Sequence, residues 1–305
     1  MTSETLDVAR MRLLREVGLR GSIAAAARAV GLTASAVSQQ LAVLEREAGT
    51  ALVDRSPRGV VLTGAGAALA ARAEQVLDVL DAARADLDRM TGAVGGRVAI
   101  GAVASAAATF VSEAVTELGV AHPAIEVSVV AAEPAWALDL LLAGDVDIAI
   151  VDEYDGVPLA LPDACAVTDL AVERLVVVTP QGFRGRTRKL TDLADAAWVM
   201  PPEEAACGRA VRAACRAAGF EPHVRWETDD MLLLARAVAE GHGIAVLPVR
   251  SVAHDVAAIE VRELREPALR RRLVAIARAS VAARPIVAEV TDALVRATDL
   301  RRRER

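Results

Sequence analysis

Residues 22–41, SIAAAARAVGLTASAVSQQL, decide the fold of the N-terminal part of this chain. A helix-turn-helix needs small residues on its first helix, a sharp turn, and a second helix whose outward face can enter the major groove. Ser22 is a predicted N-cap for an alanine-rich helix from Ile23 to Val30, and Gly31 ends that helix. The Ser22 hydroxyl is also placed to meet a phosphate. The segment therefore predicts a DNA-reading motif.

The second helix of this motif is predicted over residues 34–48, with Thr33 as its N-cap. Its buried face is formed by apolar residues at spacings of four and three: Val37, Leu41 and Leu44. Its opposite face carries three polar side chains: Ser35, Ser38 and Gln39. Side chains at the start of such a helix reach base edges, and Gln39 has the two groups needed for a bidentate contact with adenine. An apolar helix that ends at Gly18 is predicted to precede the motif.

A predicted strand pair, Leu52–Val53 and Val60–Leu62, follows the motif and flanks a turn that contains Arg55 and Arg58. These arginines are expected to bind phosphate or to enter the minor groove, which supplies affinity rather than sequence choice. The charge distribution favours this interpretation. The whole chain carries −6, yet residues 1–62 hold eight arginines against six carboxylates.

Residues 21–66 resemble the N-terminal signature of LysR-type transcriptional regulators. The sequence is GSIAAAARAVGLTASAVSQQLAVLEREAGTALVDRSPRGVVLTGAG, which departs from the usual pattern at Val53 and Gly64. The resemblance implies sequence-specific binding of double-stranded DNA. The predicted DNA contacts are Ser22, Thr33, Ser35, Ser38, Gln39, Arg55 and Arg58. The alternative is an alanine-rich helical scaffold with solvated arginines.

Residues 64–90 contain no proline and predict one long helix. Its apolar residues alternate steps of four and three, a heptad seam: Leu69, Ala73, Val76, Leu80, Ala83, Leu87 and Met90. We expect dimerisation through Leu69, Val76, Leu80 and Leu87, and the family resemblance suggests a homodimer or a homotetramer built as a dimer of dimers. The alternative is a helix that lies on the core of its own domain.

From residue 97 onward, predicted strands and helices alternate in two successive sets, which implies a parallel sheet with helices on both faces and a cleft between the sets. The family resemblance implies a periplasmic-binding-protein-like effector domain with two Rossmann-like α/β subdomains. The predicted fold class is thus α/β overall, with an N-terminal all-α winged helix-turn-helix and a long linker helix. The predicted boundaries are 1–63 for the DNA-binding domain, 64–91 for the linker helix, 92–305 for the effector domain, about 96–168 and 268–300 for subdomain I, and about 169–267 for subdomain II.

Ligands in such folds bind beyond the carboxyl ends of strands, near helix N-termini. By that rule the residues predicted to contact a small-molecule effector are Ser105, Pro202, Glu203, Thr228 and Asp229. The alternative for Ser105 and Thr228 is that they cap helices. Glu203 and Asp229 disfavour an unaccompanied anion, which leaves room for a ligand that bears an amino group.

Two cysteines, Cys207 and Cys215, lie eight residues apart on one predicted helix. Peroxide-sensing members of the family use a cysteine pair in this general region, so a thiol-based redox switch is the alternative function. A position near a helix N-terminus would lower the pKa of Cys207. Because eight helical residues span roughly 12 Å, a disulfide between the two would require unwinding.

Enzymatic motifs are missing from the sequence, which has no Gly-x-Gly-x-x-Gly, P-loop, nucleophile elbow or His-centred triad. We therefore expect no catalytic residues, no metal site and no cofactor beyond the effector. No apolar run is long enough for a membrane span, and a cytoplasmic location is expected. RNA polymerase is a candidate further partner.

Overall fold

A computed structural model of the chain describes residues 6–56, 59–91, 95–161, 165–252 and 258–303. These residues form two compact units. The N-terminal unit comprises residues 1–94 with 142–145 and 279–285, and the C-terminal unit comprises residues 95–141, 146–278 and 286–305.

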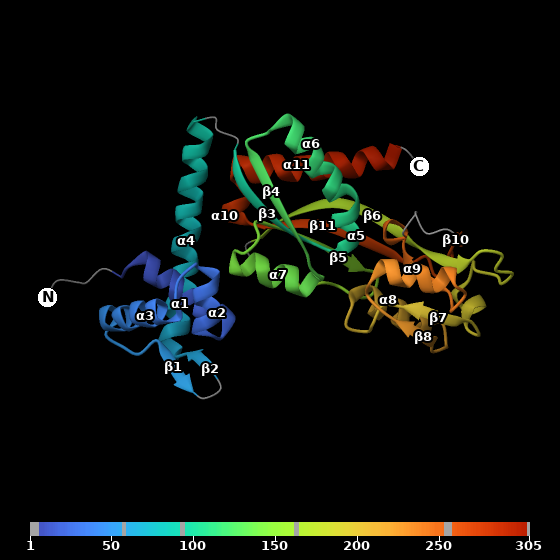
Figure 1. Ribbon diagram of the computed structural model, residues 1–305, viewed down its shortest axis with the longest axis horizontal. Helices are drawn as coiled ribbons and strands as arrows, with labels where there is room; N and C mark the ends of the chain where they lie inside the picture. Colours follow the sequence, from blue (N-terminus) through green and yellow to red (C-terminus); the bar gives the residue numbers. More distant parts are fainter. Residues whose placement is uncertain (1–5, 57–58, 92–94, 162–164, 253–257, 304–305) are drawn as a thin grey trace. The chain divides into compact units, whose positions relative to one another are not determined.

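The N-terminal unit begins with three helices, a strand pair and one long helix (Figure 1). Their bounds are α1 Val8–Arg20, α2 Ile23–Ala29, α3 Ala34–Ala48, β1 Val53–Ser56, β2 Gly59–Leu62 and α4 Gly64–Thr91. The predicted bounds of α3 are confirmed at both ends. The predicted end of the first helix at Gly18 is wrong, because α1 continues to Arg20 and ends at Gly21 with a φ of 60°. Gly18 serves packing instead, since a Cβ there would lie 2.6 Å from Leu62 Cδ1.

Side-chain caps define the helix starts in this unit. The Thr33 hydroxyl accepts a hydrogen bond from the Ala36 N–H at 3.2 Å, and the Ser22 hydroxyl accepts one from the Ala25 N–H at 3.4 Å. Both residues were predicted to be N-caps. Each cap satisfies a helix N–H that has no partner within the helix, which contributes roughly 1 kcal/mol.

The C-terminal unit is built on a sheet with the strand order β10-β6-β11-β5-β3-β4, with β9 paired to β6. The strands are β3 Gly96–Ala102, β4 Ile125–Ala131, β5 Ile148–Tyr154, β6 Cys165–Pro180, β9 Ala245–Pro248, β10 Ile259–Glu263 and β11 Arg270–Arg278. A second, parallel sheet pairs β7 Ala197–Met200 with β8 His223–Glu227.

Helices and turns of the rest of the chain include a helix in three pieces, α5 Ala104–Ala106, the π-helical η1 Ala107–Val111 and α6 Ser112–Ala121. The others are α7 Pro134–Ala143, η2 Leu190–Leu193, α8 Ala206–Ala217, α9 Met231–Ala239, η3 Val249–Ser251, α10 Ala279–Ala282 and α11 Pro285–Arg303. The expected continuous helix after Ser105 is thus interrupted at Thr109, whose backbone leaves the helical region at φ −118° and ψ −108°.

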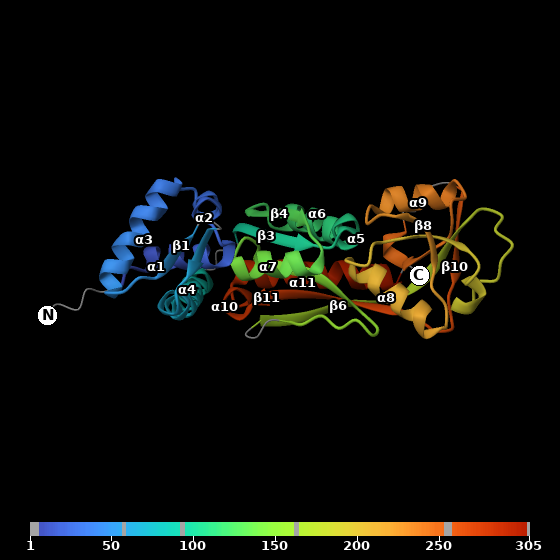
Figure 2. The same ribbon diagram turned by 90° about the horizontal axis from the view of Figure 1, so that it is seen from below.

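The expectation of a parallel sheet is correct for only part of this unit. Strand β3 pairs in parallel with β4 and β5, but β11 is antiparallel to both β5 and β6. The reason is connectivity, since β6 carries the chain along the sheet and β11 returns in the opposite direction beside it (Figure 2). The first half of β6 pairs with β11, whereas its second half pairs with β9 and β10. This one strand therefore belongs to both sets of elements.

Candidate DNA-reading face and effector cavity

Helix α3 separates a buried apolar face from an exposed polar one. Val37 and Leu44 are 0% exposed and Leu41 is 1% exposed, which fixes the rotation of the helix. Ser35 and Gln39 lie on the exposed side, and Ser38 is half-buried. The neighbouring Gln40 is also exposed, but its amide oxygen accepts a hydrogen bond from Arg10 Nε at 3.0 Å. Gln39 is therefore the better placed of the two glutamines for reading a base edge.

The wing is attached to α3 by one carboxylate. A single oxygen of Glu45 accepts hydrogen bonds from the backbone N–H groups of Leu52 and Val53, at 2.8 and 3.2 Å. Helix α4 approaches the same backbone so closely that a Cβ at Gly66 would lie 1.9 Å from the Leu52 oxygen. The resemblance over residues 21–66 includes Glu45 and Gly66, but we predicted no role for either of them. Both roles depend on contacts between α3 or α4 and the start of the wing, which the sequence does not show.

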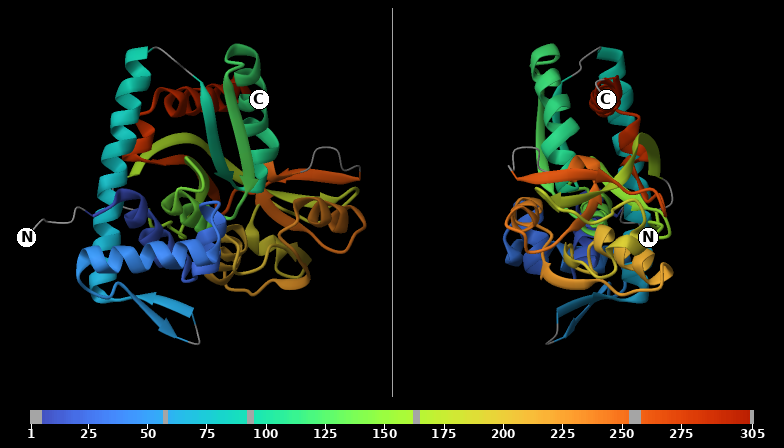
Figure 3. Two further views of the ribbon diagram at one scale, coloured as in Figure 1. Left: turned by 60° about the vertical axis from the view of Figure 1, so that its left-hand side comes forward. Right: turned by 90° about the vertical axis from the view of Figure 1, so that its right-hand side faces the viewer.

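The wing strands β1 and β2 form an antiparallel pair that projects from the three-helix cluster (Figure 3). Arg55 is opposite Val60 in this pair, and Arg58 lies outside the described residues. Val61 is 64% exposed on β2. The position of Arg55 on a projecting hairpin is compatible with a phosphate contact, which stays a prediction.

Helix α4 changes surroundings along its length. Leu69 and Val76 pack against the core under α1–α3, whereas Leu80 and Leu87 are 50% and 57% exposed. The exposed part also carries Val79 and Met90. The first half of the predicted seam therefore lies on its own domain, as the alternative interpretation held, and the second half presents apolar side chains to solvent.

A cavity of about 50 Å³ lies in the C-terminal unit where both sets of elements contribute. Its lining includes Ser105 and Asp229, two of the predicted effector contacts, but not Pro202, Glu203 or Thr228. Thr228 instead accepts a hydrogen bond from the Asp230 N–H at 3.1 Å. Asp230 in turn caps α9 by accepting the N–H groups of Leu232 and Leu233. Two of the N–H donors at this helix N-terminus are therefore already satisfied by a carboxylate.

The wall of the cavity contains a buried ion-pair cluster that the sequence analysis did not find. Arg271, only 2% exposed, donates from Nη1 to Asp152 Oδ2 at 3.0 Å and from Nε to Glu173. The Tyr154 hydroxyl also donates to Asp152 Oδ2, at 2.9 Å. Burial raises the pKa of Tyr154, which keeps its hydroxyl protonated as a donor. Burial lowers the pKa of Arg271, but Tyr154, Glu173 and Asp152 raise it by more, so its guanidinium stays charged.

Comparison with known proteins identifies the family. Residues 8–67 match the family described as bacterial regulatory helix-turn-helix protein, lysR family, and residues 91–299 match the LysR substrate binding domain. The chain belongs to the LysR family of transcriptional regulators. The resemblance inferred from residues 21–66 is thereby confirmed, as is the mixed α/β fold class.

Relatives of this LysR-family chain cover nearly all of its length. It is similar to the HTH-type transcriptional regulator GbpR of Rhizobium radiobacter, with 30% identity over 275 residues, which are 87% of this chain and 88% of GbpR. Its fold is similar to that of full-length OxyR from Pseudomonas aeruginosa, with a TM-score of 0.72 and 20% identity over 95% of each chain. It is also similar to full-length CbnR in complex with its target DNA, with a TM-score of 0.56 and 20% identity over 96% of this chain and 99% of CbnR.

The cysteines of this LysR-family chain lie in surroundings that disfavour the thiolate. Cys207 and Cys215 are both on α8. Desolvation and the Asp152 carboxylate raise the pKa of Cys207 to about 12, and desolvation and Glu221 raise that of Cys215 to about 12. The lowered pKa expected for Cys207 is wrong, because desolvation of its thiol and the Asp152 carboxylate outweigh the lowering by Arg271 and Tyr154. Thiolates are the reactive form, so both thiols are expected to react slowly with peroxide.

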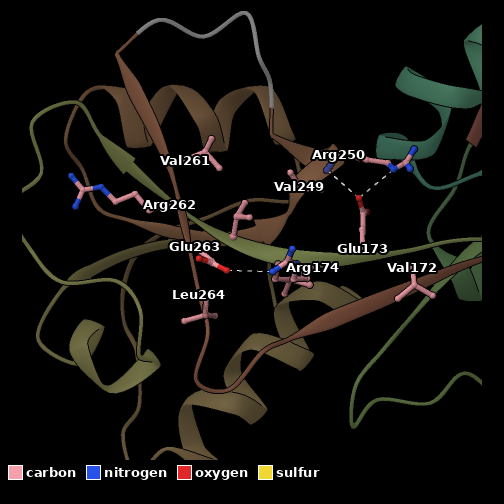
Figure 4. Close-up of a pocket in the computed structure, with 11 residues that line it drawn as sticks. Val172, Glu173, Arg174, Val249, Arg250, Val261, Arg262, Glu263 and Leu264 are labelled. Carbon is pink, nitrogen blue, oxygen red and sulfur yellow. Dashed lines mark hydrogen bonds and ion pairs between the residues drawn. The ribbon is translucent and has the colours of Figure 1, made fainter. Parts of the chain in front are cut away.

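A larger hollow of about 420 Å³ lies between β6, β10 and η3 (Figure 4). Its charged side chains form ion pairs: Arg174 pairs with Glu263 and Arg250 with Glu173 inside the lining, and Arg262 pairs with Glu260 outside it. None of the predicted effector contacts lines it. Size alone would favour this hollow, but its charges are already neutralised, so the smaller cavity at Asp152 is the better candidate for an effector.

No group of three or more histidine, cysteine, aspartate or glutamate side chains in the described part of the chain is placed to hold a metal ion. Among the described residues, no helix is long and apolar enough to cross a bilayer.

Proposed function

We propose that this LysR-family regulator reads its DNA site through Gln39 on α3, with the wing on the phosphates, and that a small molecule in the cavity at Asp152 adjusts that binding. The observation that carries the DNA-reading part is the rotation of α3, which buries Val37 and Leu44 completely and leaves Gln39 exposed. A helix held in this way presents its polar face with little freedom, as base recognition requires.

Selection from randomised DNA sites tests the assignment of Gln39. Gln39→Ala should relax the choice of base at one position and cost about 1–3 kcal/mol there, since one bidentate contact is lost. Gln40→Ala is the matched control, because its side chain already holds Arg10 and should leave the preferred site unchanged. An unaltered site with Gln39→Ala would show that this residue does not read a base.

Dimerisation is proposed through the exposed second half of α4, with a second copy of this chain as the occupant. Leu80 and Met90 are 50% and 84% exposed along one helix that carries a heptad pattern, and exposed apolar stripes of this kind pair with one another. Leu80→Asp should reduce the mass measured by light scattering to that of one chain. Val261→Asp, at a side chain 47% exposed on β10, should leave the mass unchanged.

Effector control is proposed through Ser105, which lines the cavity. Ser105→Trp should fill it and abolish the response of DNA binding to an effector, whose expected size is about 5- to 150-fold. Thr228→Trp should have a weaker effect, because Thr228 does not line the cavity. DNA binding without effector should survive in both variants. Cys207 and Cys215 take no part in this proposal, because their raised pKa values disfavour a thiol switch.

A further inference from the structure

The cavity at Asp152 contains a carboxylate oxygen that has no hydrogen-bond partner among the described residues. Asp152 is 5% exposed, and its Oδ2 accepts from both Arg271 and Tyr154. Its Oδ1 is buried without any hydrogen bond. A buried acceptor without a hydrogen bond destabilises the fold, more so when it is charged, and therefore favours a ligand or an ordered water that donates a hydrogen bond to it.

Negative charge predominates in the same lining. Three carboxylates, Glu133, Asp152 and Asp229, face the cavity, against the single guanidinium of Arg271. That guanidinium is already engaged by Asp152 and by Glu173 behind it. Although Glu133 reaches the surface, desolvation, then Asp152 and Asp229, raise its pKa, which shows that the carboxylates repel one another. A cation would relieve this repulsion, and an anion would add to it.

A second cavity, of about 80 Å³, shares Glu133 and Asp152 with the first. The cavity of about 50 Å³ has room for on the order of four water molecules, and therefore for a ligand group of about four heavy atoms. The buried cluster also contains Arg271 Nη2, a donor that has no acceptor in the part of the chain that the structure describes. A ligand that satisfies both atoms carries a donor nitrogen and, close to it, an acceptor oxygen.

We infer that the effector of this regulator is a small organic amine that carries an oxygen acceptor, held by its protonated nitrogen between Asp152, Glu133 and Asp229. The inference deepens the proposed function and rests on it. In this proposal Asp152 anchors the ligand, and the carbon chain of the ligand extends into the second cavity, which Glu133 also lines.

Matched pairs of small molecules test the inference on the full chain. Ethanolamine and 5-amino-1-pentanol each carry one ammonium and one hydroxyl group, and ethylene glycol and 1,5-pentanediol replace the ammonium by a second hydroxyl. The amines should raise the unfolding midpoint and bind in calorimetry at least tenfold more tightly than their diols. Glycolate, an anion with the same two-carbon chain, should bind more weakly than ethanolamine.

Variants locate the binding. Asp152→Asn should weaken amine binding at least tenfold, and Asp139→Asn, on the exposed part of α7, should not change it. Since Asp152 is paired with Arg271 and its variant can fail to fold, Glu133→Gln and Asp229→Asn provide independent tests at residues that reach the surface. Each of these two substitutions should weaken amine binding severalfold. Binding should also weaken as the pH falls and Glu133 takes up a proton beside Asp152, Asp229, Arg209 and Arg271.

Several results would overturn the inference. Tighter binding of glycolate than of ethanolamine would do so, as would equal binding of amines and diols, or no amine bound at up to about 10 mM, where even a millimolar ligand is largely bound. DNA binding is measured on the same samples. A bound amine that leaves DNA binding unchanged defeats effector control but not the ligand class, whereas a carboxylic acid that alters DNA binding defeats the ligand class alone.

Discussion

The DNA-reading face and the effector cavity use polar side chains in opposite ways. On α3, the polar residues Ser35 and Gln39 lie outside a core that is apolar beneath them. Around the cavity, Asp152, Glu173 and Arg271 are buried beneath the surface and hold one another. The first arrangement presents fixed groups to a partner that is already polar. The second places charged groups in a region of low dielectric, where their electrostatic interactions with a bound ion are strong.

The largest expected effect breaks the buried arrangement. Arg271→Met leaves Asp152 without its cation and Glu173 with Arg250 alone, and it should lower the free energy of unfolding by about 3–5 kcal/mol, as expected when one partner of a buried ion pair is removed. All three tryptophans, Trp136, Trp198 and Trp226, lie in the C-terminal unit, so tryptophan fluorescence during urea unfolding reports on this unit.

The adjacent arginine is the control for this experiment. Arg272 has a side chain that is 39% exposed and pairs with Glu153 and Asp169, so Arg272→Met should cost no more than about 1 kcal/mol. Equal losses in the two variants would show that the buried cluster is not special.

The second prediction disturbs the N-terminal unit. Gly66→Ala places a Cβ 1.9 Å from the Leu52 oxygen, and the resulting shift of α4 against the wing should cost about 1–3 kcal/mol. Gly64→Ala meets open space and should be neutral or stabilising by up to about 1 kcal/mol. Thermal unfolding followed by far-ultraviolet circular dichroism, together with DNA affinity, measures both. A Gly66→Ala protein as stable as Gly64→Ala would contradict the close approach.

The same contrast explains how far the sequence predicts the two regions. The ends of α3 follow from Thr33 and Gly49, which act within a few residues, so local rules sufficed. The cavity combines Glu133, Asp152 and Arg271, which are far apart along the chain. Ser105 and Asp229 were predicted at the ligand site because ligands bind beyond the carboxyl ends of strands. Nothing in the sequence of the three consecutive arginines 270–272, however, indicates which of their side chains is buried. Strand β10 was also missed: its five residues alternate apolar and charged side chains, as in a strand, but no turn signal precedes them.

The smallest expected effect concerns Glu133 and depends on pH. Its pKa is raised above the ordinary value of 4.5, first by desolvation and then by Asp152 and Asp229. Between 4.5 and the raised value, the folded protein binds more protons than the unfolded chain, so the free energy of unfolding falls as the pH rises through this window. Glu133→Gln removes the charge and should be more stable than the parent at pH 7.

The advantage of Glu133→Gln should disappear near pH 4, where the parent carboxyl is protonated in both states. Glu126→Gln, at a side chain 68% exposed beside Arg97, should show no such pH-dependent gain. Urea unfolding of the three proteins at several pH values, followed by tryptophan fluorescence, gives the comparison. If the gain in stability of Glu133→Gln persists unchanged at pH 4, the substitution acts through side-chain packing and not through the charge of Glu133. A gain in stability that is lost at low pH would show that repulsion among the cavity carboxylates destabilises the protein. A bound amine should then remove the same gain at pH 7, because it neutralises the charge that the substitution deletes.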